Sequence, residues 1–386
     1  MGETTIRNSR RKKNVATTLA DWSTLHQDFI NCFAHQIVSM KDFFAFGGVS
    51  KSWRSAIKEN SNTALRLQHK VPVLILSKEI NTPVRNIYSL TEGQISQLDL
   101  LETKGKLCFS SLGWLLTVSH DYSTLDLFNP LTHAHIELPP PLPPKKFSLR
   151  NLKKFVLSSS PSFTSDYGVM LLSYHHLAFY KPGYNNGTWT LGPIPLPEPL
   201  ILVDAVYYKG QFYVVDYRGK VFVCKIEDPN NAAQMRLVAP EIPEQLFGKD
   251  IHFIARYLVE SATGTLLLVV TLYEDNCEVT TGCRVFEVPI NTGNSWAKSE
   301  VKNLGNTTLF VGANNSSFWI EPLDDSVCKA NCIYFLNRSH VSTADDIDIG
   351  IYHMKDGKMD KHLEELPDFK YKGSSLTSHS WLQPSF

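Results

Sequence analysis

The sequence predicts an α+β protein in two parts, a small helical module near the N-terminus followed by a large all-β domain. Between residues 25 and 37, apolar residues recur at the three- and four-residue spacing of one helix face. From Val71 onward the chain changes to short runs of β-branched and aromatic residues, separated by Gly, Pro, Asn and Ser. The 386 residues suffice for one large domain with a sizeable core and one small domain.

The first predicted helix begins near Asp28 and places on one face Leu25, Phe29, Ile30, Phe33 and Ile37. A second helix should begin near Asp42, because aspartate accepts hydrogen bonds from the free N–H groups of a helix start. Phe43, Phe44 and Phe46 then supply a second apolar patch. So small a unit cannot bury this much apolar surface alone, so we expect a partner to cover part of it.

The order of the apolar and charged residues in this module carries a resemblance. The motif residues are Leu25-His26-Gln27-Asp28-Phe29-Ile30, Phe33, Ile37, Asp42 to Phe46, and Val49-Ser50-Lys51-Ser52-Trp53-Arg54. This pattern resembles the F-box, the three-helix module of ubiquitin-ligase adaptors. His26 stands where the family usually has proline, and Gly47-Gly48 where it has better helix formers. From the residues alone, a helical hairpin that caps another domain is the alternative.

The resemblance implies that the module docks on a Skp-type subunit. The residues that it assigns to this contact are Leu25, Phe29, Ile30, Phe33, Ile37, Phe43, Val49 and Trp53. We expect Trp53 to lie in the core of the module, with Arg54 at its edge.

Charge and cysteine content narrow the class of protein. The 38 basic and 38 acidic residues give a formal net charge of zero, which argues against nucleic acid or an anionic membrane as main partner. We find no apolar run of membrane-spanning length and no secretory signal, so we expect a soluble protein of the cytoplasm, the nucleus or both. The seven scattered cysteines fit reduced thiols. The cluster Arg10 to Lys13 is either a nuclear import signal or a solubilising leader.

Strand hairpins recur through the large region. Their anchor residues, spaced about 40 to 70 positions apart, are Gly113, Gly168, Gly210, Gly264 and Cys332. This spacing is typical of propeller blades, small sheets that must stack on one another to bury their faces. We predict five or six blades, with a two-sheet β-sandwich as alternative. Because an open ring exposes two sheet edges, either Val71 to Leu76 or Ser380 to Pro384 should close it.

These patterns divide the chain into four segments: a disordered tail over 1–20, the helical module over 21–60, a linker over 61–70 and the propeller over 71–386. The large segment also resembles the kelch-related domain that follows the F-box in a plant family. The phrases that carry this resemblance include Gly113-Trp114-Leu115, Leu127-Phe128-Asn129-Pro130, Gly210 to Asp216, Tyr257 to Ser261, Leu309 to Gly312 and Asn331 to Phe335.

Catalytic and metal-binding patterns are weak. The sequence lacks the G-x-S-x-G, P-loop and H-E-x-x-H motifs. The pairs His133/His135 and His175/His176 would need further ligands, and Cys328 and Cys332 lack a second cysteine pair at zinc-site spacing. We therefore predict no metal or cofactor. Four aspartates are expected to cap backbone groups at strand ends or turns, without acid–base roles: Asp204, Asp216, Asp324 and Asp325.

Together the two resemblances imply a non-catalytic adaptor of a ubiquitin ligase of the Skp–cullin–F-box type. The F-box would bind the Skp-type subunit, and through it the cullin and RING subunits, while the propeller holds an unknown target protein. Two alternatives remain open. One is a propeller enzyme or receptor with a small molecule in the central channel. The other is a scaffold whose F-box has lost its partner.

Overall fold

The structure is a computed structural model. It describes residues 22–37, 40–59, 71–76, 81–143, 146–192, 200–225, 234–247, 251–274, 279–290, 295–322, 328–338, 347–361, 363 and 379–385. The predicted tail and linker, Asp324 and Asp325 lie outside these residues.

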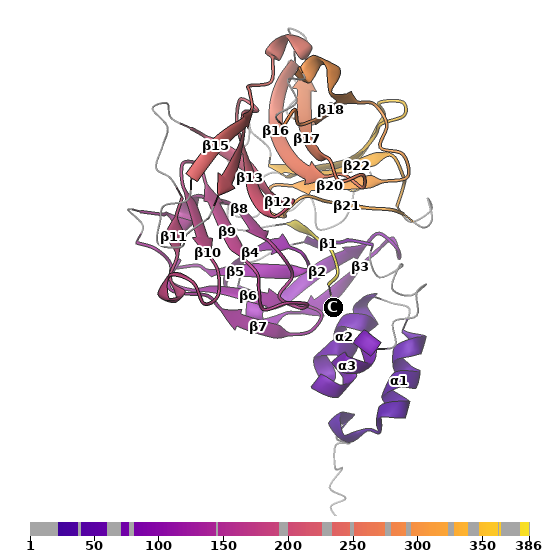
Figure 1. The fold of residues 1–386 in the computed structure, drawn as a ribbon. Coiled ribbons are helices and arrows are strands. Elements are labelled where there is room, and N and C mark those ends of the chain that lie inside the picture. The colour runs from indigo at the N-terminus through magenta and orange to yellow at the C-terminus, as the bar shows by residue number, and fades with distance from the viewer. Residues whose placement is uncertain are drawn as a thin grey trace, which may run out of the picture.

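Three helices form the module near the N-terminus (Figure 1). A 3-10 turn η1 (Trp22–Thr24) precedes α1 (Gln27–Gln36), α2 (Met40–Val49) and α3 (Lys51–Glu59). His26 caps α1, because its Nδ1 accepts a hydrogen bond from the Asp28 N–H at 3.4 Å. Histidine thus takes the capping role at the position where the F-box pattern has proline. Ser50 caps α3 in the same way, with its Oγ 3.4 Å from the Trp53 nitrogen.

The strands of the described residues form six sheets that follow one another around a common centre (Figure 1). Blade 1 contains β25 (Ser380–Leu382), β1 (Val73–Leu76), β2 (Val84–Ser89) and β3 (Gln94–Asp99). Blade 2 contains β4 (Lys106–Ser111), β5 (Trp114–Ser119), β6 (Leu125–Asn129) and β7 (Ala134–Glu137). Blade 3 contains β8 (Leu152–Leu157), β9 (Val169–Ser173), β10 (Leu177–Tyr180) and β11 (Thr190–Leu191).

The second half of the ring continues the pattern. Blade 4 contains β12 (Leu202–Tyr208), β13 (Gln211–Asp216), β14 (Val221–Lys225) and β15 (Gln234–Ala239). Blade 5 contains β16 (Ile251–Glu260), β17 (Leu266–Glu274), β18 (Gly282–Glu287) and β19 (Glu300–Val301). Blade 6 contains β21 (Phe318–Ile320), β20 (Thr308–Gly312), β22 (Cys332–Arg338), β23 (Ile347–His353) and β24 (Met359–Asp360). The predicted propeller is confirmed with six blades, and the sandwich alternative is wrong.

Short 3-10 turns connect several of these strands: η2 (Leu101–Thr103), η3 (Leu149–Asn151), η4 (Asn185–Gly187), η5 (Glu244–Leu246) and η6 (Trp296–Lys298).

The two predicted closing segments pair with each other. β25, from the end of the chain, lies antiparallel to β1, with Leu74 opposite Trp381 and Ile75 opposite Ser380. Trp381 is fully buried. Blade 1 is therefore built from both ends of the large domain, which removes the two free sheet edges of an open ring.

Blade 6 departs from the simple meander. β20 pairs antiparallel with β21 on one side but parallel with β22 on the other. A parallel pair needs a crossover connection, which here leads from the end of β20 at Gly312, through β21, to the start of β22 at Cys332. The extra hairpin between β20 and β21 places residues 313–317, here called the hub loop, against blades 2 and 3.

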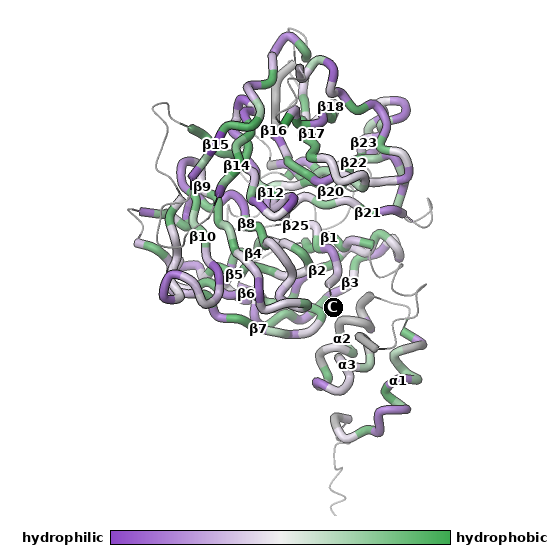
Figure 2. The backbone as a smooth tube through the Cα atoms, viewed as in Figure 1, coloured by the Kyte–Doolittle hydropathy of each residue, from purple (hydrophilic) through white to green (hydrophobic). Residues whose placement is uncertain are grey.

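Six apolar clusters fill the six interfaces between neighbouring blades. The cluster between blades 1 and 2 also takes in Ile30, Ile37, Phe46 and Ala56 of the helices, so the module packs onto this corner of the ring. Figure 1 accordingly shows α2 near β3 and beside the marked C-terminal end. In Figure 2 the hydrophobic stretches run along strands such as β14 and β17, whereas loops carry more hydrophilic residues.

Candidate functional site

Helix α1 has two apolar stripes instead of the single predicted face. Ile30, Ala34 and Ile37 follow each other at helical spacing and point inward, where Ile30 is completely buried. Phe29 and Phe33 are one turn apart on another side of the helix and are 60% and 49% exposed. The single-face prediction is wrong because consecutive helical residues such as Phe29 and Ile30 point about 100° apart.

The remaining predicted docking residues divide between packing and surface. Leu25 and Trp53 are half-buried against the same cluster as Ile30. The Trp53 ring lies 4.4 Å from that of Phe46, and its Nε1–H donates to the Trp22 carbonyl at 3.0 Å. Val49 is 43% exposed. The Phe43 and Arg54 side chains lie outside the described residues.

We call the exposed rings of Phe29 and Phe33 the α1 face. Trp22 and Val49 are further exposed apolar residues of the same module. The Trp22 side chain is 59% exposed, although its backbone carbonyl accepts a hydrogen bond from the Trp53 ring. Large apolar side chains at this exposure are suited to a protein–protein contact, because their burial by a partner removes apolar area from water. Ile30 and Ile37 can support such a contact only by holding the helix in place.

The second candidate lies at the centre of the propeller, where the sequence offered only the alternative of a small molecule in the channel and named no residues for it. Lys154 of β8 and Asp204 of β12 are 1% and 0% exposed, and the Lys154 Nζ lies 2.5 Å from the Asp204 Oδ1. The ammonium also donates to the carbonyls of Gly312 and Asn315, at 2.8 and 2.7 Å. The other Asp204 oxygen accepts from the Leu258 N–H at 2.7 Å. Four blades thus meet at one ion pair.

Burial dominates the electrostatics of this pair. It lowers the pKa of the Lys154 ammonium, and it raises the pKa of the Asp204 carboxyl. In both cases the charge of the partner opposes the effect of burial. The prediction that Asp204 lies at a strand end or turn is wrong, because this residue lies inside β12. Its carboxylate does accept from a backbone N–H, that of Leu258. The overlooked signal was charge within otherwise apolar strands. Leu152 to Leu157 contains two lysines, and Leu202 to Tyr208 contains one aspartate.

The hub loop carries the network to the remaining blades. Ser110 of β4 donates from its N–H to the Asn314 carbonyl, and its carbonyl accepts from the Ser316 N–H. The Ser110 Oγ donates to the Trp381 carbonyl of β25 at 2.5 Å. These bonds connect blades 6, 2 and 1, so polar contacts at the centre join all six blades. Charged side chains paired in this way are enclosed, and we assign them to holding the ring together.

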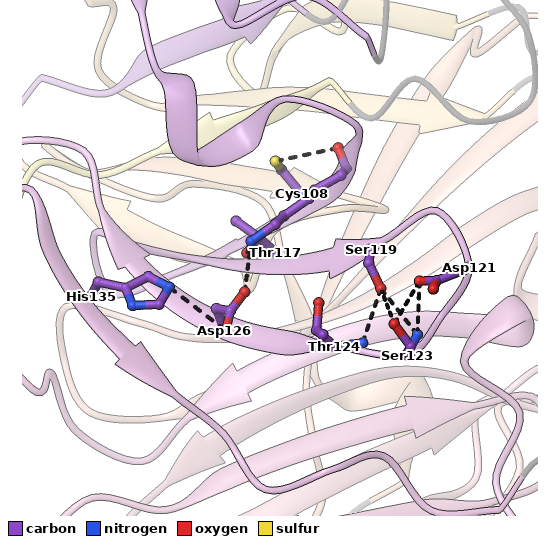
Figure 3. A network of polar contacts seen from close by, with 9 residues as sticks. Cys108, Thr117, Ser119, Asp121, Ser123, Thr124, Asp126 and His135 are labelled. Atoms are coloured by element: carbon purple, nitrogen blue, oxygen red, sulfur yellow. Dashed lines mark hydrogen bonds and ion pairs between the residues drawn. The ribbon is translucent and has the colours of Figure 1, made fainter.

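The two histidines of the first pair, His133 and His135, point to different groups. His133 faces Glu102 at 3.6 Å, whereas His135 faces Asp126 at 3.6 Å (Figure 3). Asp126 also pairs with Lys106 at 2.6 Å. Within the described residues, we find no cluster of three or more His, Cys, Asp or Glu side chains placed to hold a metal ion.

Asp216 behaves as expected of a turn aspartate. Its Oδ1 accepts from the N–H groups of Arg218 and Lys220, at 3.0 and 2.8 Å. None of the described helices is both long and apolar enough to cross a membrane.

The fold and the helices define a class of protein: a six-bladed propeller whose corner carries a three-helix module. A family model described as the KIB1-4 beta-propeller matches residues 87–353. The chain therefore belongs to the KIB1-4 beta-propeller family.

The chain is also similar to two proteins from Arabidopsis thaliana. F-box protein SKIP23 is 24% identical over 91% of this chain and 93% of its own length. Putative F-box protein At5g55150 is 24% identical over 84% of this chain and 87% of its own. The predicted resemblance to plant F-box proteins with a propeller domain is thereby confirmed. Among solved structures, TolB from Acinetobacter baumannii aligns at a TM-score of 0.41 with 9% identity, over 87% of this chain and 74% of that one.

Proposed function

We propose that the chain is a substrate adaptor of a ubiquitin ligase of the Skp–cullin–F-box type. The α1 face binds the Skp-type subunit, and the propeller holds a target protein for ubiquitination. The observation that carries the proposal is the exposure of Phe29 and Phe33 on a helix whose other stripe is buried. The F-box names of the similar Arabidopsis proteins support it.

The adaptor contributes proximity. A target lysine and the charged conjugating enzyme held in one complex react at a raised effective concentration, so this chain needs no acid–base group of its own. The charged pair at the propeller centre is consistent with that role, because Lys154 and Asp204 are buried and paired with each other. The cytoplasm and the nucleus are both proposed as locations.

The test separates contact from packing. We expect the double variant Phe29→Ala/Phe33→Ala to lose Skp-type binding by on the order of 100-fold, if each ring is worth about 1 to 2 kcal/mol. Circular dichroism and propeller stability should stay unchanged, because both rings are exposed. The matched control is Phe163→Ala, at a ring 77% exposed on blade 3. Undiminished binding by the double variant, measured by co-purification and calorimetry, contradicts the proposal.

A further inference from the structure

Three successive blades carry the same arrangement on the loops between their second and third strands. Each loop holds a tyrosine whose ring lies next to a cation. The distances from ring centroid to cation are 5.5 Å for Tyr122 with Arg150, 4.0 Å for Tyr174 with Lys153 and 5.3 Å for Tyr217 with Arg218. We call these six residues the tyrosine–cation row.

Backbone and side-chain contacts make the row continuous. Arg150, on the approach to blade 3, reaches over Tyr122 of blade 2. The Tyr174 carbonyl accepts from the Leu202 N–H at 2.8 Å, and the Tyr217 N–H donates to the Ile201 carbonyl at 2.9 Å. One connecting segment therefore joins the loops of blades 3 and 4. The row follows one edge of the ring over blades 2, 3 and 4.

The row lies on the edge opposite to the turn between β4 and β5. That turn, at Gly113, is covered by residues 383–385 of the chain. Because strands of one hairpin run antiparallel, the loops after β5, β9 and β13 emerge at the other edge.

The row offers positive charge to solvent. Arg150 and Arg218 are exposed, and the Tyr174 and Tyr217 rings are 40% and 39% exposed. Three acidic groups among the described residues lie nearby. The Asp216 carboxylate is engaged within its own turn, where it accepts from the N–H groups of Arg218 and Lys220. Glu241 is 3.8 Å from Arg218, a long and exposed pair of the kind that contributes little. The Asp121 carboxylate is engaged within its own loop, where it accepts from the Ser123 N–H and Oγ–H at 3.1 and 2.8 Å (Figure 3).

We propose that the tyrosine–cation row binds an acidic, Asp- and Glu-rich segment of the target protein. This inference rests on the adaptor function proposed above and names the chemistry of the partner. The cations come from blades 3 and 4 and lie beside tyrosines of three successive blades, so they suit an extended row of carboxylates. A phosphate site would instead converge several donors on one point. A nucleic-acid site would need rings open for stacking and a basic surface overall, whereas here cations lie on the rings and the chain is neutral.

The experiment selects ligands from a random ten-residue peptide library displayed against the full-length chain. We expect bound peptides to be enriched in Asp and Glu over the starting library. A selected peptide is then synthesised with a fluorophore and titrated by anisotropy. The variant Arg150→Gln/Lys153→Gln/Arg218→Gln should weaken binding about tenfold, and higher salt should weaken binding to the native chain. The control Lys302→Gln, at a side chain 76% exposed beyond blade 5, should change nothing.

Several results would overturn the inference. They are the absence of Asp and Glu enrichment, equal binding by the triple variant, and equal binding of a peptide in which Asn and Gln replace the acids. Displacement of the peptide by a 12-nucleotide single-stranded RNA at lower concentration, or binding only after serine phosphorylation, would assign the row to another ligand. Skp-type binding is measured separately on the same variants. If the native chain does not bind the Skp-type subunit, the adaptor function is refuted, and the peptide titration is unaffected.

Discussion

The Lys154 ammonium and the Asp204 carboxylate lie 2.5 Å apart on the innermost strands of blades 3 and 4, and both side chains are buried. Taking two charges out of water is costly, so such a pair stabilises the ring only while both partners and their hydrogen bonds are in place. The carbonyls of Gly312 and Asn315 and the Leu258 N–H supply those further bonds.

Removing one partner of this pair should strongly lower the free energy of unfolding. We expect Lys154→Ala to lower the free energy of unfolding by about 3 to 5 kcal/mol, because it leaves the Asp204 carboxylate buried without its counter-charge. The double variant Lys154→Met/Asp204→Leu should cost much less, since it removes both charges and keeps most of the volume. Denaturant unfolding followed by tryptophan fluorescence measures both. A double variant as damaged as the single one would show that packing, and not charge, sets the cost.

His379 predicts a loss of stability in mild acid. Burial lowers its pKa from 6.5 to about 4, so the folded protein resists protonating it. Above pH 6.5 the ring is neutral in both states and costs nothing. As the pH falls from 6.5 towards 4, the unfolded chain binds a proton that the folded chain does not. Stability should therefore fall by roughly 3 kcal/mol across that interval.

Variants isolate the His379 contribution. His379→Gln should flatten the pH dependence of the melting temperature between pH 6.5 and 4, whereas His26→Gln, at a side chain 73% exposed, should leave it steep. An unchanged slope in His379→Gln would mean that other groups produce the acid sensitivity.

Gly113 should tolerate substitution worse than a glycine of the same backbone shape. Gly113 and Gly210 have φ values of +80° and +82°, so alanine strains both by about 1 kcal/mol. A Cβ on Gly113 would in addition meet the Gln383 carbonyl oxygen at 2.9 Å and collide with Ser385, whereas one on Gly210 meets nothing within 4 Å. The difference in unfolding free energy between Gly113→Ala and Gly210→Ala measures what the C-terminal segment contributes. If both variants lose the same unfolding free energy, residues 383–385 move aside without measurable cost.

Local patterns predicted the parts of the fold that depend on neighbours in sequence. Hairpin spacing predicted the blades, and the need to close the ring selected Val71 to Leu76 and Ser380 to Pro384. The pairing of these two segments with each other depends on contacts across the whole domain, so the sequence left them as alternatives. The parallel pairing of β20 with β22 was missed for the same reason, since periodicity does not reveal strand order.

The candidate sites show the same limit at the level of side chains. The sequence predicted an apolar α1, but the packing of α2 and α3 decides that Ile30 is buried while Phe29 is exposed. Lys154 and Asp204 can be read from the sequence as charges within apolar strands, but their pairing exists only because the ring brings two strands together. The tyrosine–cation row was missed because Arg150 and Tyr122 come from different blades. Composition reports the net charge of zero but not where the charges gather.

The division of labour between helices and propeller predicts the behaviour of a fragment over 61–386. It keeps all six sheets and the pairing of β1 with β25, so it should fold alone as an all-β domain. Removing the helices uncovers apolar groups such as Leu98 and Leu100 of the shared cluster, and we expect a cost of about 2 kcal/mol. The fragment should bind the target but not the Skp-type subunit. In cells it should occupy the target without delivering it, so target abundance should rise.

Full-length Phe29→Ala/Phe33→Ala is the matched control for that fragment. It keeps the cover over Leu98 and Leu100 yet should also lose the Skp-type subunit, so it should raise the same target protein. Quantitative proteomics after expression of each protein makes the comparison. A target that accumulates with both identifies delivery as the lost step, whereas accumulation with the fragment alone would point to its uncovered apolar surface. If no protein accumulates with either one while both are folded, the adaptor function fails, and a ligand of the propeller itself becomes the explanation to pursue.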